Sequence, residues 1–176
     1  MNIVKSINQY NEDSVYFSEP IQNNIMCDGT FIRIIYSTNL ITLNGVYLHI
    51  MINNNNIEKY YNKYKCNFDI SNHKELISQI RHIEINLLKK VNIKDKIPQL
   101  KITEQLMKGN IKIFIDNNID NNIDNNIDNN IDNNIDNNID NNIDNNININ
   151  NIYILKISGI WETDAYYGVT YKFMHV

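Results

Sequence analysis

Few residues of this sequence stand in a pattern that could support catalysis. No Ser, Cys or carboxylate lies in a recognisable nucleophile motif, and no Gly-rich loop is present that could cradle a phosphate. The two cysteines form no CxxC motif and have no histidine at metal-ligand spacing. The four histidines are scattered over the chain, at His49, His73, His82 and His175. We therefore expect a protein that is not an enzyme, with no catalytic residue, metal or cofactor, and treat an active site assembled from distant residues as the third-ranked alternative.

The charged side chains of the β-rich segments indicate a different chemistry. In residues 30–37, Ile32, Ile34 and Tyr36 line one side of an alternating pattern, and Phe31 and Arg33 line the other. Five such segments carry at least one cation in the register opposite the apolar one: Arg33, Lys63, Lys65, Lys112, Lys156 and Lys172.

Cations interleaved with aromatic rings suit a surface for single-stranded nucleic acid, because Lys and Arg contact phosphates while flat rings stack on bases of any sequence. Phe31 and Phe114 share the cationic register, and Tyr36 and Trp161 are further candidates for stacking. An ordinary solvated sheet face with surface lysines explains the same pattern equally well. For Trp161, the register shared with Leu155 favours packing in the core over stacking.

The elements that would hold these side chains are mostly strands. The closing stretch, residues 151–176, predicts an antiparallel hairpin that turns at Glu162–Tyr166. Asn44-Gly45 predicts a tight hairpin between residues 40–43 and 46–52, with a polar loop at 53–56. Further strands are expected at 14–18, 30–37, 63–70 and 111–115, and a turn of helix at 103–108.

One longer helix is predicted over Asn72–Val91. Asn72 and Glu75 have the spacing of a capping box. Apolar residues then recur at intervals of three and four, at Leu76, Ile80, Ile83, Leu87 and Val91. The fold class expected from these patterns is mostly β: an OB-like barrel or curved antiparallel sheet with this single amphipathic helix packed on it.

Residues 115–146 are the tetrad Ile-Asp-Asn-Asn written eight times. A period of four drifts about 40° per repeat around an α-helix, so its isoleucines cannot keep one face. Asn and Asp also favour turns over helix interiors. We expect a disordered low-complexity hairpin loop at 116–150, inserted into one mostly-β domain made of residues 1–115 and 147–176.

Charge and composition bound the class of protein. The formal net charge is −4, but the repeat holds eight Asp and no cation, so the remainder carries 16 basic and 12 acidic residues, a net charge of +4. This mild basicity permits contact with nucleic acid. The amino terminus lacks the apolar run of a signal peptide, and no segment is apolar over the ~20 residues that cross a bilayer. The two cysteines are far apart in the sequence, which favours reduced thiols. These features predict an intracellular protein that does not contact a membrane.

Several motifs support a resemblance to known proteins. They are YFSEP at 16–20, GTFIRIIYS and LNGVYL within 29–48, EQLMKGNIKIF at 104–114 and ILKISGIWETDAYYGVTYKF at 154–173. In these stretches the chain resembles a group of short, uncharacterised proteins of nucleocytoplasmic large DNA (giant) viruses. More distantly, the closing hairpin looks like that of viral and phage-type single-stranded-DNA-binding proteins with an OB-fold. Those phage proteins end in an acidic tail, whereas this chain ends Lys-Phe-Met-His-Val.

The resemblance implies a function in viral DNA replication, repair or recombination, carried out in the host cytoplasm, at a virus factory, or in the virion. The leading hypothesis is therefore sequence-tolerant binding of single-stranded DNA, or of RNA. The alternative is a structural or adaptor module that binds a protein partner through a sheet edge or the Asn-rich loop. Self-association into a homo-oligomer is also left open.

Overall fold

A computed structural model of the chain describes residues 4–23, 29–60, 63–114 and 151–175, except for the side chains of Tyr60 and Phe114. The α-helices are α1 (Lys74–Lys90) and α2 (Lys101–Leu106). The strands are β1 (Lys5–Ser6), β2 (Val15–Phe17), β3 (Ile21–Gln22), β4 (Thr30–Ser37), β5 (Thr42–Leu43), β6 (Val46–Met51), β7 (Asn54–Tyr60), β8 (Lys63–Phe68), β9 (Ile97–Gln99), β10 (Asn110–Phe114), β11 (Ile152–Glu162) and β12 (Tyr166–His175). Short 3₁₀ helices cover Ile7–Gln9, Glu12–Ser14 and Ile70–His73.

One mixed sheet joins the described strands, in the order β1-β6-β11-β12-β10-β8-β7. Where β6 ends, β4 takes its place beside β11, and β4 in turn carries β2, β3 and β5. The prediction of a mostly-β fold with one long helix is confirmed. The sheet is not purely antiparallel, because β1–β6, β10–β12 and β9–β12 pair in parallel. Among the described strands it also stays open between β1 and β7, as a curved sheet rather than a closed barrel.

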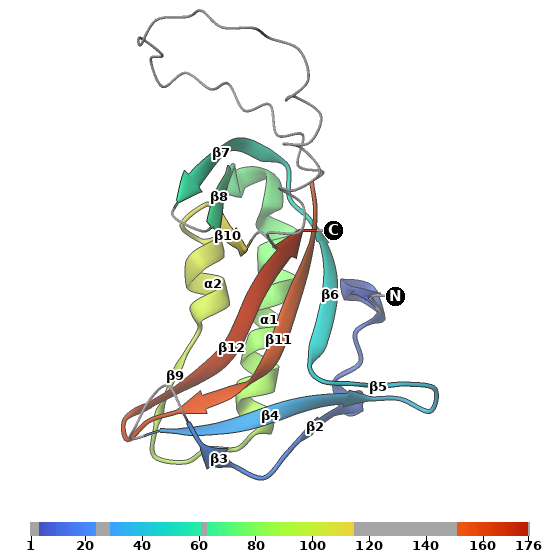
Figure 1. Cartoon of the computed structure of the whole chain (residues 1–176), viewed down its shortest axis with the longest axis vertical. Coiled ribbons are helices and arrows are strands. Elements are labelled where there is room, and N and C mark those ends of the chain that lie inside the picture. The colour runs from blue at the N-terminus through green and yellow to red at the C-terminus, as the bar shows by residue number, and fades with distance from the viewer. Residues whose placement is uncertain (1–3, 24–28, 61–62, 115–150, 176) are drawn as a thin grey trace, which may run out of the picture.

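Helix α1 covers one face of this sheet and leaves the other face without a helix. Figure 1 shows α1 running behind β11 and β12, with β4 crossing their lower end. The buried helix residues Ile80 and Leu87 belong to the same core cluster as Leu155 and Phe173 of the sheet. The predicted apolar stripe is therefore largely correct. None of the helices among the described residues is both long and apolar enough to cross a bilayer.

The start of α1 differs from the prediction. A 3₁₀ turn, Ile70–His73, precedes the helix, and the Asp69 carboxylate accepts the backbone N–H of Ser71 at 2.8 Å. Asp69, rather than Asn72, thus caps this helical segment, because the 3₁₀ turn moves the first free N–H groups toward the N-terminus.

Glu84 joins the two helices. Its side chain is fully buried, and its carboxylate accepts the backbone N–H groups of Ile102 and Thr103, both at 2.9 Å, and the Thr103 hydroxyl at 2.6 Å. These N–H groups lie in the first turn of α2, where no partner exists within the helix. Burial raises the pKa of Glu84, against the effect of these hydrogen bonds. The carboxylate therefore fixes α2 against α1 from within the core.

Three predicted connections are wrong. Strand β5 pairs with β4 and not with β6, so Asn44-Gly45 forms a corner instead of a hairpin turn. Gly45 has φ +111°, and a Cβ there would lie 2.6 Å from the carbonyl oxygen of Ile157, so this corner presses closely on β11. Most of the predicted polar loop at 53–56 is the start of β7, which pairs with β8.

The third correction concerns the insert. A hairpin loop would join paired strands, but β10 pairs with β8 and β12, and β12 lies between β10 and β11. The connection from β10 to β11 therefore passes over one strand. The prediction that residues 116–150 are disordered lies outside the described residues.

Candidate nucleic-acid interface

The face of the sheet opposite α1 carries all six cations predicted for the interface, and we call it the basic face. Lys156 lies directly opposite Lys172 in the β11–β12 ladder. Lys112 lies directly opposite Lys65 in the β10–β8 ladder. The parallel pairing of Ile113 with Phe173 then places Lys112 beside Lys172.

Four lysines from four adjacent strands thus form one line across the sheet, which we call the lysine row: Lys65, Lys112, Lys172 and Lys156. Neighbouring strands are about 4.8 Å apart, so the row is about 14 Å long from β8 to β11. Lysines directly opposite one another in a ladder repel, which is unfavourable for the sheet. An anion bound across the row would relieve this repulsion, which is most direct between Lys156 and Lys172.

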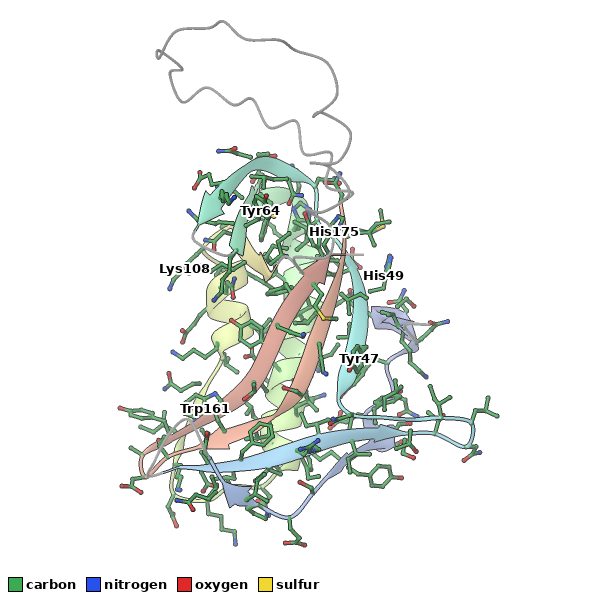
Figure 2. The ribbon with its side chains drawn as sticks, viewed as in Figure 1. Tyr47, His49, Tyr64, Lys108, Trp161 and His175 are labelled. Carbon is green, nitrogen blue, oxygen red and sulfur yellow. The ribbon has the colours of Figure 1, made fainter. Side chains whose placement is uncertain are left out.

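The lysine at each end of the row contacts a side chain of the next strand. At the β7 end, the Lys65 Nζ lies 3.7 Å from a carboxylate oxygen of Glu58, in an exposed pair that contributes little to stability. At the β6 end, the Lys156 Nζ lies 4.9 Å from the centre of the Tyr47 ring. Figure 2 shows Tyr47 along β6. The ammonium of Lys172, in the middle of the row, makes no ion pair with any described residue.

Two further cations lie on the same face, outside the row. Lys63 is opposite Phe114 in the β8–β10 ladder, two residue pairs from the row and therefore on the same side of the sheet. Arg33 is opposite Gly159, where β4 pairs with β11. Its side chain is exposed and makes no ion pair within the part of the chain that the structure describes.

The aromatic candidates divide between the two faces. Tyr36 is 2% exposed in the core, where its hydroxyl accepts the backbone N–H of Asn11, so the prediction that it could stack on a base is wrong. Phe114 pairs with Met174 and Lys63 in its two ladders, and its side chain is not described.

Trp161 lies on the basic face, contrary to the favoured prediction of core packing. The ladder between β11 and β12 shifts register between Ile157 and Gly159, so Ser158 is an extra residue. Such a β-bulge reverses which side of the sheet the following residues face. Ile160 is consequently buried in the core and pairs with Ile32, while Trp161 pairs with Phe31.

The histidines and cysteines do not gather into a site. His73 is buried, with Nε2 accepting the Asn53 backbone N–H at 3.0 Å, and His175 packs edge-on against Tyr153. Among the described residues, no three His, Cys, Asp or Glu side chains lie together as metal ligands would. Cys66 is buried, and Cys27 lies outside the described residues.

A small cavity lies beside β6, between Lys5, Tyr10 and Tyr36. It has a volume of about 10 Å³, which is room for about one water molecule. The cavity therefore cannot hold a nucleotide or a cofactor.

Some members of the face were missed by sequence reasoning. Tyr47 alternates with core residues in a recognisable strand, but its place next to Lys156 depends on the β6–β11 register. Tyr16 and Ile21, 55% and 54% exposed, pair with Ile35 and Phe31 of β4 and extend the face with apolar surface. The segment of Tyr16 was predicted as a strand with no sign of which strand it would join, and no strand was predicted at Ile21–Gln22.

Comparisons with known proteins add no relative. No protein-family model, curated protein or solved structure matches this chain.

Proposed function

We propose that this protein binds single-stranded nucleic acid, with little regard to sequence, through the basic face. The observation that carries the proposal is the lysine row, in which two cross-strand pairs set lysine directly against lysine. A line of cations that repel one another is stabilised by a polyanion lying across it. The resemblance to giant-virus proteins gives the proposal a setting in viral DNA replication, repair or recombination.

Contacts to phosphates explain the tolerance of sequence. The phosphate groups are the same at every nucleotide, so lysines that contact them supply affinity and position without reading bases. The six cations of the basic face are drawn from β4, β8, β10, β11 and β12, and β12 is the central strand of that group. Among the described residues, no helix packs on the basic face, since α1 and α2 pack on the other side of the sheet.

Binding of labelled oligonucleotides at rising salt tests the proposal. Each phosphate contact on a single strand contributes about −0.7 to the slope of log K against log salt, so the four lysines of the row predict a slope near −3. The double variant Lys112→Glu/Lys172→Glu should abolish most of the affinity for strands of ~20 nucleotides.

The matched control is Lys74→Glu/Lys89→Glu, which makes the same change of charge on exposed positions of α1. Its affinity should fall only slightly, because these lysines lie on the helical layer. Equal losses in the two double variants would mean that overall charge, and not the basic face, governs binding. No binding by the unaltered protein at low salt would refute the proposal outright.

A second candidate is a structural or adaptor module that binds another protein, in a virion or a virus factory. The observation that favours it is the apolar end of the basic face, where Ile21 is more than half exposed opposite Phe31. Tyr16 is also more than half exposed, farther along β4 and opposite Ile35. Exposed apolar side chains that adjoin one another are typical of protein contact surfaces. Sedimentation of the protein at rising concentration checks one form of this function: self-association that Ile21→Ser abolishes would support it, and a monomer at all concentrations would count against it.

A further inference from the structure

Phe31 and Trp161 form a pair on the basic face, which we call the aromatic shelf. They lie directly opposite each other in the β4–β11 ladder, and both side chains are partly exposed. Trp161 lies near the end of β11 (Figure 2), beyond Lys156 of the lysine row along the strand.

Each ring of the aromatic shelf packs over a glycine of the neighbouring strand. A Cβ on Gly168 would lie 2.8 Å from Cζ2 of Trp161, and a Cβ on Gly159 would lie 2.6 Å from Cε2 of Phe31. The rings therefore occupy the space that a side chain would fill at these positions. One side of each ring packs on backbone, and the exposed part faces away from the sheet, which is the arrangement a stacking platform needs.

Positive charge continues along β11 from the lysine row toward the aromatic shelf. Lys156 and Trp161 are five residues apart on β11, which corresponds to about 15 Å when the bulge is allowed for. Arg33 lies between them, opposite Gly159. No acidic residue is paired with this part of β11: Lys156, Gly159 and Trp161 face Lys172, Thr170 and Gly168 on β12.

We infer that the bound strand runs along β11 and β12, from the lysine row past Arg33 to the aromatic shelf, where an unpaired base stacks on Trp161 or Phe31. This inference rests on the proposed function and adds its ligand class: a strand with accessible base faces, in preference to a duplex or another polyanion. In a duplex each base is stacked between its neighbours, so it must leave the stack before it can reach a protein ring.

The rings also have a structural effect, which the test must separate from binding. An aromatic side chain over a cross-strand glycine stabilises a sheet by covering it. Loss of affinity after a Trp161 substitution therefore decides nothing alone. The decisive comparison varies the ligand and leaves the protein unchanged.

The experiment uses the unaltered full chain and its only tryptophan, Trp161, as the fluorescent reporter. The probes are an oligothymidylate of ~12 nucleotides, an abasic strand with the same number of phosphates, and a duplex of equal length. Stacking of one base contributes about 1–3 kcal/mol, so the oligothymidylate should bind about 5- to 150-fold more tightly than the abasic strand. Only the oligothymidylate should quench Trp161.

Variants locate the effect on the shelf. Phe31→Leu and Trp161→Leu should each lower affinity for the oligothymidylate toward that for the abasic strand, without changing the abasic affinity. Leu40→Ala removes a 93% exposed apolar side chain in the loop between β4 and β5. This variant should change neither the affinity for the oligothymidylate nor the affinity for the abasic strand.

The outcomes separate this inference from the proposed function. Equal affinity for oligothymidylate and abasic strand, with Trp161 emission unchanged, would overturn the inference and leave phosphate binding by the lysine row intact. Binding of none of the probes at low salt would overturn both.

Discussion

Replacing Lys172 with glutamine should make the protein more stable and a weaker binder at the same time. Lys172 lies directly opposite Lys156 and beside Lys112, and it has no ion-pair partner among the described residues. Two like charges ~6 Å apart in water repel by about 0.7 kcal/mol at low ionic strength. Glutamine removes the charge and keeps the first half of the aliphatic stem, next to the backbone.

The expected gain is therefore about 0.5–1 kcal/mol in the free energy of unfolding, or a rise of roughly 2–5 °C in Tm for a domain of this size. Salt screens charges over a Debye length of about 10 Å at 0.1 M, so the difference in Tm between the two proteins should shrink as salt is added. For nucleic acid, the loss of one phosphate contact should reduce the salt slope by about 0.7.

Thermal unfolding by circular dichroism at low and high salt, together with the oligonucleotide titration, measures both effects. Lys89→Gln on α1 is the control and should leave the salt slope unchanged. A Tm that falls in Lys172→Gln at low salt would show that the lysines of the row do not repel significantly. An unchanged salt slope would show that Lys172 does not contact phosphate.

Three other predictions follow from charge and hydrogen bonding. Deleting residues 115–146 should leave the Tm nearly unchanged, because β10 and β11 are only two strand spacings apart and five residues remain to join them. The same deletion should tighten oligonucleotide binding at low salt, because it removes eight Asp. Glu84→Gln should lower the free energy of unfolding in urea by about 1–3 kcal/mol, because an amide offers a single acceptor oxygen to donors on Ile102 and Thr103. The hydrogen bond from Lys96 holds the pKa of Glu162 below its usual value, so this carboxylate stabilises the fold above its unfolded-state pKa and loses that effect as the pH falls through the folded-state pKa. The destabilisation caused by Glu162→Gln should accordingly be present at pH 7 and vanish in acid; a difference that stays constant with pH would contradict this.

The strands and the helix were largely predictable from local patterns. Alternation in Thr30–Ser37 correctly placed Ile32 and Ile34 in the core and Arg33 outside. The same rule failed beyond Ser158, because a single extra residue in β11 reverses the alternation. The sign of it in the sequence is Gly159, since an isolated glycine inside a strand often accompanies a bulge. Trp161 was therefore assigned to the core although it lies on the basic face.

Strand pairing was much less predictable. Asn44-Gly45 suits a tight turn, but β5 pairs with β4 instead of β6, and the two edges of β6 pair with β11 and β1. The lysine row also depends on strand pairing that local patterns do not predict. Alternation showed that each lysine faces away from the core, but only the ladder registers show that four of them align, and registers depend on contacts between distant segments.

Because the lysine row takes one residue from each of four strands, no single segment of the chain can reproduce it. An unfolded chain would present the same charges without their alignment, so a ligand that needs the row binds the native state selectively. At a ligand concentration about 100 times the Kd, such selectivity raises the free energy of unfolding by about 2.7 kcal/mol. Thermal shift across a panel of polyanions is therefore a direct way to rank ligands for this surface, with no need for a label or an assumed activity.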